Sequence, residues 1–487
     1  MTDTNPYLVG VDEITMTKFD GRDEMSIKPQ VVETVIYQSI FSPTIKATLL
    51  LNDYVNLLNN YPMVGEETIT LTLKQRRPDD EQITYTVEFV VSAIRDIIVN
   101  DGGRQLIYSI DLVSKEAFNN AKTRVSKAYY DNVEAIVRDL LKSYLKSSKD
   151  LILYDTAEQR TEEKTVTKKT RKYVVPNITP FAAIKFLTKY AVSDEDKKNY
   201  TYMFYEVLNG VKKSNVVTDY RESNTKTVKP NFMFKALQKQ TYLGAVDEAA
   251  RKAAEDNPYF FVSNIEALRS NKQAMETLVN RGYTESRSIS GMKFNKRYAT
   301  LEKIIGGYFE NEFIEVNMHQ KDHKVTKFTV DQLENTLYPS KLNTDKYIKD
   351  VKDQNEDTET SARMRYIVNN YDDLTQPALR DKFGPSAADY LAYNSIDISV
   401  GIPTNLDVRP GDLMYIHVPE FHGFNQVSDD AYLTGFFVVS EVKNVVRTSG
   451  ETSTLLRVNK DSLLNGIFET SSFNLGRGAE NIRLIKE

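Results

Sequence analysis

Hydrophobic and polar residues alternate along the first 112 residues of the chain. Within residues 45–51 the aliphatic side chains fall mainly on one parity, with Lys46 and Thr48 on the other. The same alternation recurs in three further stretches, residues 68–74, 86–93 and 106–113. A period of two is typical of half-buried strands. Several short strands with turns between them predict a small antiparallel β-barrel over residues 1–112.

The spacing of apolar residues changes from two to 3.6 at about residue 114. Residues 131–145 carry one continuous apolar helical face. A second helix is predicted to begin where Thr179 occupies the N-cap position and Pro180 the first helical position, at which a missing N–H costs nothing. We therefore predict a helix-containing α/β domain over residues 113–199.

The period of two returns towards the end of the chain. We predict that residues 200–240 combine with residues 391–465 into a second β-barrel that is related to the first. A mixed α/β insertion, residues 241–390, interrupts this barrel and contains the charged loop 346–364. Residues 466–487 are predicted to form a short polar tail. The chain therefore has two β-rich ends with mixed segments between them.

Composition narrows the class of protein. The 487 residues carry a net charge of −5, so no global basic field attracts nucleic acid or acidic lipid. Cysteine is absent, which excludes disulfides, thiolate zinc sites and a cysteine nucleophile. The Lys-rich run 161–172 is interrupted by glutamates and is interpreted as a solvated loop. Without a signal peptide or an apolar run of roughly 18 residues, we expect a cytoplasmic-type soluble protein with no stable membrane insertion.

Sequence motifs for catalysis are missing. The chain has no G-x-S-x-G elbow, no G-x-x-x-x-G-K-[ST] phosphate loop, no G-x-G-x-x-G and no H-E-x-x-H. Carboxylate pairs such as Glu312 with Glu315 and Asp429 with Asp430 occur, but nothing in the sequence sets them at the separation that a glycosidase needs. We therefore expect a non-enzymatic protein with no catalytic residues and no cofactor.

Three stretches have a spacing that could suggest a ligand, and each has a simpler interpretation. His319 and His323 are four residues apart, but their surroundings predict a strand entering a turn rather than a helix. Residues 353–359 share the first ligand spacings of an EF-hand, whereas its required Gly and Glu positions hold Thr and Met. Residues 409–412, Arg-Pro-Gly-Asp, are explained by turn chemistry alone. We expect no metal site.

The order of several segments resembles the central hub protein of contractile-tailed bacteriophage baseplates, the ring that joins the tail tube to the membrane-piercing spike. The matching stretches are IYQSIFSPTIKATLLLND, YPMVGEETITLTL, DNVEAIVRDLLKSYL, VPNITPFAAIKFLTKYAVS, YTYMFYEVLNG, ISVGIPTNLDVRPGDLMYIHVPE and YLTGFFVVSEVKNVV. They are spread over most of the chain, and their shared order and spacing carry the resemblance. Residues 241–290 and 346–364 match nothing in the family.

The resemblance implies a mixed β-rich (α+β) fold, with two related antiparallel β-barrel tube domains and helix-containing inserted domains. It also implies a structural hub in the virion tail baseplate, made in the host bacterial cytoplasm. Such a hub is a homotrimer that adapts the sixfold tail tube to the threefold central spike and lines a channel through which genomic DNA passes without specific binding. Its implied partners are the spike, the tail tube proteins and other baseplate proteins. Two alternatives stay open: a hub-associated cell-wall hydrolase, and a hub or spike component of a phage-like bacterial injection machine.

A corner of the first barrel supplies the candidate subunit contacts. Pro43 removes a backbone donor, so the strand ladder breaks there and the chain turns. In the hub family the corresponding strand pair belongs to a barrel that packs against copies of itself. The resemblance therefore makes Tyr37, Ile40 and Phe41 candidate interface anchors. The alternative is that Ile40 and Phe41 cap the core of their own barrel.

Overall fold

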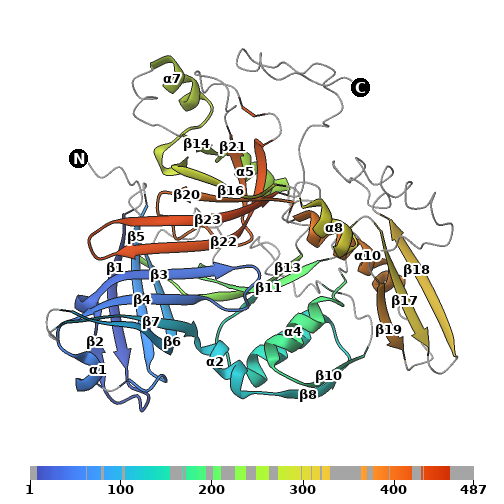
Figure 1. Cartoon of the computed structure of the whole chain (residues 1–487), viewed down its shortest axis with the longest axis horizontal. Coiled ribbons are helices and arrows are strands. Elements are labelled where there is room, and N and C mark those ends of the chain that lie inside the picture. Colours follow the sequence, from blue (N-terminus) through green and yellow to red (C-terminus); the bar gives the residue numbers. More distant parts are fainter. Residues whose placement is uncertain are drawn as a thin grey trace.

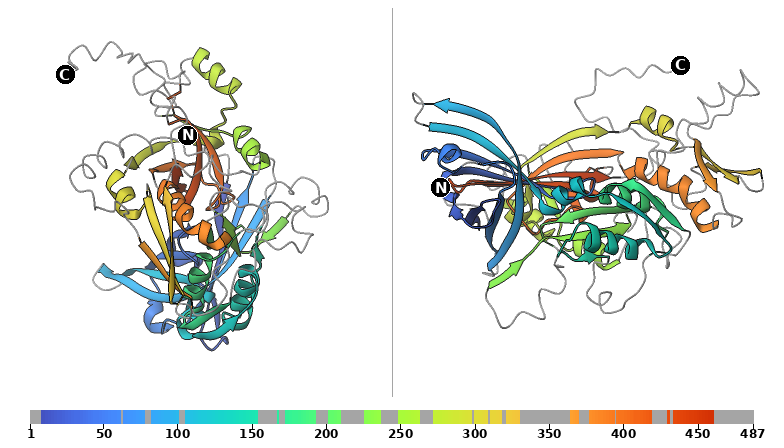
Figure 2. Two further views of the ribbon diagram at one scale, coloured as in Figure 1. Left: turned by 90° about the vertical axis from the view of Figure 1, so that its right-hand side faces the viewer. Right: turned by 90° about the horizontal axis from the view of Figure 1, so that it is seen from below.

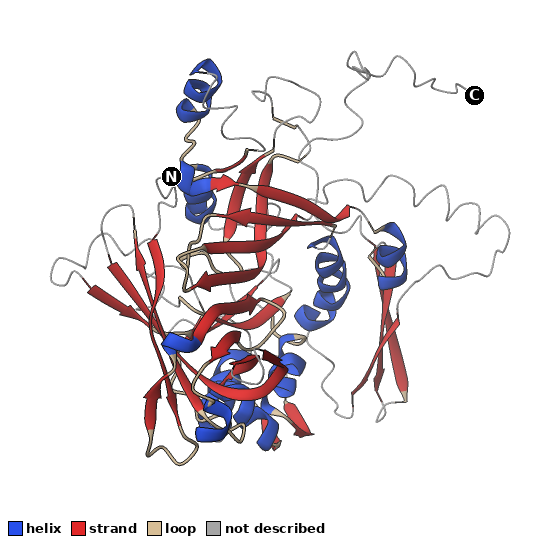
Figure 3. Cartoon of the chain, turned by 60° about the vertical axis from the view of Figure 1, so that its left-hand side comes forward, coloured by secondary structure: helices blue, strands red, loops and turns tan. Residues whose placement is uncertain are grey.

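The fold is mixed and β-rich, as the sequence predicts, with most strands gathered into one 15-stranded sheet (Figure 1, Figure 3). Three small sheets and several helices accompany it. The computed structural model describes residues 8–61, 63–77, 82–100, 105–153, 167, 172–192, 201–209, 225–236, 248–262, 272–297, 299–308, 310–317, 321–329, 364–369, 377–393, 395–418, 429–430 and 433–460.

The first barrel is formed by the N-terminal strands in the order β2-β1-β5-β6-β7-β4-β3, all antiparallel. One parity of each strand faces a single apolar core; Ile69, Leu71 and Leu73 of β5 are fully buried there. The alternation in the sequence is therefore confirmed as the inside–outside pattern of these strands. The elements are β1 (Leu8–Thr17), β2 (Glu24–Ser26), a 3-10 turn (Lys28–Gln30), β3 (Val31–Ser39), β4 (Lys46–Asp53), α1 (Leu57–Asn60), β5 (Thr68–Arg76), β6 (Gln82–Asn100) and β7 (Gln105–Ser114).

The second barrel encloses its own core, which includes Ile398, Phe437 and Val458. Its strands follow the order β15-β14-β21-β22-β23-β20-β16. Three of them come from the segment that we predicted as an insertion, because their apolar side chains pack against this core. The strands are β14 (Tyr259–Phe261), β15 (Ser288–Ile289), β16 (Gly291–Arg297), β20 (Ile396–Ile402), β21 (Leu413–His417), β22 (Gly435–Arg447) and β23 (Thr452–Lys460).

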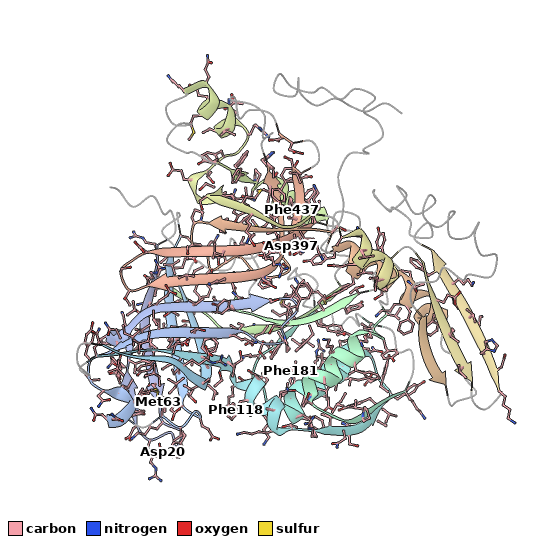
Figure 4. All side chains as sticks on the ribbon, in the orientation of Figure 1. Asp20, Met63, Phe118, Phe181, Asp397 and Phe437 are labelled. Atoms are coloured by element: carbon pink, nitrogen blue, oxygen red, sulfur yellow. The ribbon has the colours of Figure 1, made fainter. Side chains whose placement is uncertain are left out.

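An α/β domain packs below the barrels in Figure 1, and Figure 4 shows Phe118 and Phe181 on its helices. We expected residues 200–240 in the second barrel, but β11 and β13 pair with each other and with β9 in this domain. Their aromatic side chains explain the difference, since Tyr202 stacks on Phe234 inside the core of the α/β domain. The elements are α2 (Lys115–Lys122), β8 (Val125–Tyr129), α3 (Val133–Asp139), a π-helical turn (Leu140–Tyr144), β9 (Leu151–Ile152), β10 (Tyr173–Ile178), α4 (Pro180–Thr188), β11 (Tyr202–Val207) and β13 (Asn231–Ala236). β12 (Thr225–Val228) pairs with β6 of the first barrel.

The remaining elements come from the predicted insertion. A three-stranded sheet in the order β18-β17-β19 packs against α10 at one side of the molecule (Figure 1). The elements are α5 (Glu248–Glu255), α7 (Lys272–Asn280), a 3-10 turn (Glu285–Arg287), α8 (Thr300–Gly306), β17 (Glu310–Asn317), β18 (Asp322–Thr329), β19 (Met364–Asn369) and α10 (Pro377–Tyr393). His323 lies on β18, as the strand interpretation expects. Outside the described residues lie His319, segment 353–359, tail 466–487, the loop 346–364 up to residue 363, and most of the run 161–172.

Candidate functional site: the seam between the two barrels

One pair of strands joins the two barrels into a single sheet. β22 pairs antiparallel with β3, from Glu441 opposite Ser39 to Arg447 opposite Glu33. The sheet therefore continues through eight strands, in the order β6-β7-β4-β3-β22-β23-β20-β16. Figure 1 shows the blue strands of the first barrel directly beside the red strands of the second. We call the β22–β3 ladder, with the side chains that cross it, the seam.

Apolar side chains of the second barrel complete the core of the first. Val446 at the end of β22 is 1% exposed and belongs to the first barrel's core. Leu406, in the segment between β20 and β21, is fully buried in the same core. Burying such a side chain completely contributes about 1.5–3 kcal/mol. The second barrel therefore contributes side chains to the first barrel's core, and the two barrels form one packed unit.

Asp407 is the polar counterpart of these contacts. Its buried carboxylate accepts hydrogen bonds from Gln75 Nε2 at 3.1 Å and Arg77 Nε at 2.9 Å, both on the first barrel. It also accepts from Tyr85 OH at 2.7 Å and from Asn209 Nδ2 at 3.0 Å. Buried carboxylates need this number of partners, because an unpaired buried charge is very costly. Asp407 thus ties the second barrel to the first barrel and to the segment after β11.

The predicted turn at residues 409–412 is present. The contacts to the first barrel are made by Leu406 and Asp407, just before this turn. Asp412 accepts a hydrogen bond from the Arg409 backbone N at 3.0 Å, and Gly411 has a positive φ of 84°. The sequence predicts a turn without a ligand here and gives no role to Leu406 or Asp407. The available signal in the sequence was an apolar side chain, Leu406, directly before a carboxylate, Asp407, within a turn.

The candidate interface residues lie at the end of the seam. Ile40 is 1% exposed and packs with Tyr205 of the α/β domain and Val438 of the second barrel, so this chain buries it, although not in the core of its own barrel. Tyr37 and Phe41 are 40% and 46% exposed. The Lys443 ammonium lies 5.4 Å from the centre of the Tyr37 ring, and the Phe41 ring meets Tyr390 edge-on at 6.3 Å. The interface role that we predicted for this corner therefore falls to Tyr37 and Phe41, and it stays a prediction.

The two barrels are built on the same plan. The segment Phe-Val-Val-Ser occurs twice, at residues 89–92 on β6 and 437–440 on β22. In both strands the serine is the extra residue of a β-bulge. Ser92 Oγ donates to the Asp111 carbonyl at 3.0 Å, and Ser440 Oγ donates to the Arg457 carbonyl at 3.0 Å. The sequence predicts related barrels, and this repeat identifies the equivalent residues.

The strand orders agree with that repeat. The first barrel contains the order β5-β6-β7-β4-β3, and the second contains β21-β22-β23-β20-β16. In both cases the long strand first pairs with the strand before it in the chain and then with the one after it. β6 is therefore the equivalent of β22, and β16 is the equivalent of β3.

The outer face of the seam is polar and hollowed. A depression of about 710 Å³ is lined by residues of both barrels, among them Tyr37, Ser399 and Lys443. Asp397, which Figure 4 labels on the second barrel, accepts a hydrogen bond from Arg457 Nε at 2.9 Å. This bond raises the pKa of Arg457, so the guanidinium stays charged. The described residues contain no group of three or more His, Cys, Asp or Glu placed to hold a metal ion.

A second buried polar cluster fixes the α/β domain to the first barrel. The Glu206 carboxylate is almost fully buried and accepts from the Ile45 backbone N at 2.9 Å and from Ser114 Oγ at 2.6 Å. Lys149 Nζ lies 2.6 Å from Glu206 and 2.6 Å from Glu116. Burial raises the pKa of Glu206, and the ammonium of Lys149 opposes that shift. Every member has a partner within this chain, so the cluster is structural.

None of the described helices combines the length and apolarity needed to span a membrane.

Comparison with solved structures finds proteins whose backbone follows a similar path. No family model and no curated protein matches the sequence. Among solved structures, the 43 kDa tail protein of prophage MuSo2 from Shewanella oneidensis has a TM-score of 0.46 at 9% identity, covering 92% of this chain and 97% of that one. The tail protein from Neisseria meningitidis MC58 has a TM-score of 0.46 at 12% identity, covering 93% and 97%.

A third similar structure is the E. coli c3393 protein, a component of the type VI secretion system that exhibits structural similarity to T4 bacteriophage tail proteins gp27 and gp5. Its TM-score is 0.40 at 6% identity, with 92% of this chain and 76% of that chain covered. All three TM-scores are below 0.5.

Proposed function

We propose that this chain is the structural hub of a contractile phage tail, or of a related injection machine, in which three copies form a ring around a channel. The single observation that carries the proposal is the seam, which holds two barrels of one plan rigidly side by side. Three copies of such a unit present six similar barrels. A ring of this kind matches a sixfold tube on one face and a threefold spike on the other.

The geometry of the seam suits a closed ring. The two barrels meet through different strands, β22 of one and β3 of the other, so the contact is heterologous rather than twofold. Heterologous contacts repeat from unit to unit and close into a ring when the rotation allows it. The partners in this proposal are two further copies of the chain, the central spike, the tail tube proteins and other baseplate proteins. The location is the tail baseplate of the virion.

The exposed face of the eight-stranded sheet suits a channel for DNA. Two arginines on this face are paired with carboxylates: Arg95 lies 2.8 Å from Asp111, and Arg457 lies 3.2 Å from Glu441. The Lys443 ammonium lies over the Tyr37 ring instead. Free Lys and Arg side chains would bind phosphates through counterion release and would hold the DNA. Pairing these two arginines with carboxylates reduces the positive field on the face, which favours a channel that DNA passes without specific contacts. Retention of the assembled ring on DNA at low salt would contradict this part of the proposal.

The mass of the purified particle tests the ring. Sedimentation equilibrium at increasing protein concentration should give three times the chain mass of 55.7 kDa. End-on electron micrographs of that particle should show six lobes arranged with threefold symmetry. A protein that stays monomeric at its highest soluble concentration, and also with its spike partner present, would overturn the proposal.

The competing function is a hub-associated cell-wall hydrolase. The missing catalytic motifs favour the structural role. Incubation of the purified protein with bacterial cell wall should release no more soluble fragments than buffer does. Turnover that disappears when one carboxylate pair is changed would establish the enzyme instead. Whether the hub serves a phage or a bacterial injection machine is decided by the neighbouring genes.

A further inference from the structure

Buried polar side chains line the inner side of the seam. Thr34 and Gln38 of β3 and Asn444 of β22 point inward, where they alternate with aliphatic side chains of the same strands. Thr404, in the segment between β20 and β21, is fully buried like Thr34 and Asn444, and Gln38 is 2% exposed. We call these four residues the polar layer. Because a buried polar group is costly unless it forms hydrogen bonds, each of them requires partners.

Two segments of the chain cover the polar layer from the inside. Between β20 and β21, the backbone N of Asn405 donates to Thr454 Oγ1 at 3.2 Å, and Thr454 Oγ1 donates to Asn444 Oδ1 at 2.7 Å. Just after β11, the backbone N of Leu208 donates to Gln38 Oε1 at 2.7 Å. In Figure 2 (right) the blue strands of the first barrel, the red strands of the second and the green strands of the α/β domain converge near the centre of the molecule. The two barrels and the segment after β11 therefore enclose the layer together.

Only one half of each amide in the polar layer is satisfied. Gln38 Oε1 and Asn444 Oδ1 accept the hydrogen bonds just described, whereas Gln38 Nε2 and Asn444 Nδ2 are buried without a partner among the described residues. The hydroxyl oxygens of Thr34 and Thr404 are buried without a partner in the same part of the chain. A buried donor left unpaired costs its full desolvation, and native proteins rarely contain one. Four such atoms on one side of one strand pair therefore point to a ligand.

The strand register brings these four atoms near one another. Asn444 stands opposite Ile36, and Thr34 and Gln38 are two residues to either side of Ile36. Diagonal neighbours of this kind have Cα atoms about 7–8 Å apart, within reach of long side chains. Thr404 is held beside Asn444 by the hydrogen bonds of the residue that follows it. Polar atoms that are close together but beyond direct hydrogen-bonding distance are suited to a bridging water molecule.

The chemistry of the four atoms selects water as the ligand. The two amide nitrogens can only donate, whereas each threonine hydroxyl can both donate and accept. A water molecule can accept from the amide nitrogens and also bond to the hydroxyls, and buried waters typically make about three such hydrogen bonds. All four groups are uncharged, so the polar layer offers no counter-charge to a bound ion.

We propose that ordered water molecules occupy the polar layer, where they accept hydrogen bonds from Gln38 Nε2 and Asn444 Nδ2 and bond to the hydroxyls of Thr34 and Thr404. This water fixes the register of the seam. A slip of one residue would turn the inward side chains outward. A slip of two residues keeps the inward faces together, but it moves Asn444 away from Thr34 or from Gln38 and breaks the bridges. The proposal does not depend on the proposed ring.

The sign of one isosteric substitution tests the proposal. Thr34→Val replaces the buried hydroxyl with a methyl group of similar size. A hydroxyl that bonds to water loses that bond on substitution, so the midpoint of urea denaturation should fall. In a dry layer the methyl group would be the better occupant, and the midpoint would rise. The matched control is Thr70→Val, on the partly exposed side of β5, which should leave the midpoint unchanged. An unchanged or higher midpoint for Thr34→Val, or an equal decrease in the control, overturns the proposal.

A high-resolution crystal structure of the full chain gives the direct readout. Solvent density is expected within hydrogen-bonding distance of Gln38 Nε2 and of Asn444 Nδ2. Hydrogen bonds from these two nitrogens directly to protein atoms, with no solvent between them, would overturn the proposal whatever the denaturation midpoints are. If Thr34→Val does not fold, the crystal structure of the unaltered chain decides alone.

Discussion

The seam and the end of β6 contrast a strand that is paired on both sides with one that is paired on one side. At the seam, Val446 is buried and the ladder from Glu441 to Arg447 is complete. At the end of β6 the aliphatic residues 97–99 are more than half exposed, and one side of the strand is unpaired among the described residues. Both barrels follow one plan, but β6 has a second register break, between Arg95 and Ile98, that the ladder of residues 441–447 lacks. The two strands therefore differ both in local geometry and in the neighbour that the chain supplies.

The largest expected effect comes from placing a charge on the buried side of the seam corner. Ile40→Asp puts a carboxylate into an apolar cluster where the side chain is 1% exposed, and we expect a loss of more than about 4 kcal/mol in the free energy of unfolding. Phe41→Asp changes a residue that is 46% exposed, so the chain should remain folded. Urea denaturation followed by circular dichroism compares the two. Equal destabilisation would show that the corner is not divided into a buried and an exposed residue.

Removing the carboxylate that crosses the seam should have the next largest effect. Asp407→Ala removes the buried carboxylate that accepts hydrogen bonds from Gln75, Arg77 and Tyr85, and we expect a cost of about 3–5 kcal/mol. The control is Asp111→Ala, which removes a pair with the well-exposed Arg95 and should cost less than about 1 kcal/mol. The midpoint of chemical denaturation measures both. A smaller effect for Asp407 than for Asp111 would show that Asp407 does not hold the two barrels together.

Truncation of one buried and one exposed aliphatic residue separates folding from assembly. Val446→Ala removes buried methyl groups from the first barrel's core and should lower the free energy of unfolding by about 1–2 kcal/mol. Ile98→Ala changes a side chain that is 53% exposed, so the stability of the isolated chain should stay the same while the ring dissociates at lower dilution. Thermal unfolding and sedimentation measure the two quantities. The comparison fails if Ile98→Ala destabilises the isolated chain as much as Val446→Ala.

The smallest effect is expected from the exposed ion pair at the end of the seam. Arg447 Nε donates to Glu33 at 2.7 Å across the two barrels, and this hydrogen bond raises the pKa of Arg447. The arginine is half-exposed, so salt screens the pair. Glu33→Gln should lower the melting temperature slightly at low salt and not at all at high salt. A decrease that persists at high salt would mean that the contact acts through packing.

Much of the fold follows from local patterns in the sequence. The alternation around residues 45–51 identified β4, and the N-cap Thr179 with Pro180 identified α4, because both signals depend on near neighbours in the chain. The β-rich class and the division into two strand-rich ends follow from the same patterns. The assignment of residues 200–240 to the second barrel was wrong for β11 and β13. Their alternation suits any sheet, and only the stacking of Tyr202 on Phe234 shows which core they join.

The seam itself could not be predicted from such patterns. Asp407 contacts Gln75 and Tyr85, which are more than 300 residues away in the sequence. Local patterns in the sequence cannot predict a contact between residues so far apart. Ile40 and Phe41 are adjacent apolar residues, and only the packing distinguishes the buried one from the exposed one. The repeated Phe-Val-Val-Ser segment was readable in the sequence. It would have matched β6 to β22, although not the strand that each one pairs with.

The most direct test of the seam is amide hydrogen exchange on the folded chain. Backbone amides that form the ladder between β22 and β3 should be as protected as those inside each barrel, because ladder hydrogen bonds and packing cover them. Amides on the unpaired side of residues 92–100 of β6 should exchange faster. A folded chain in which the seam amides exchange as fast as these amides of β6 would contradict the account.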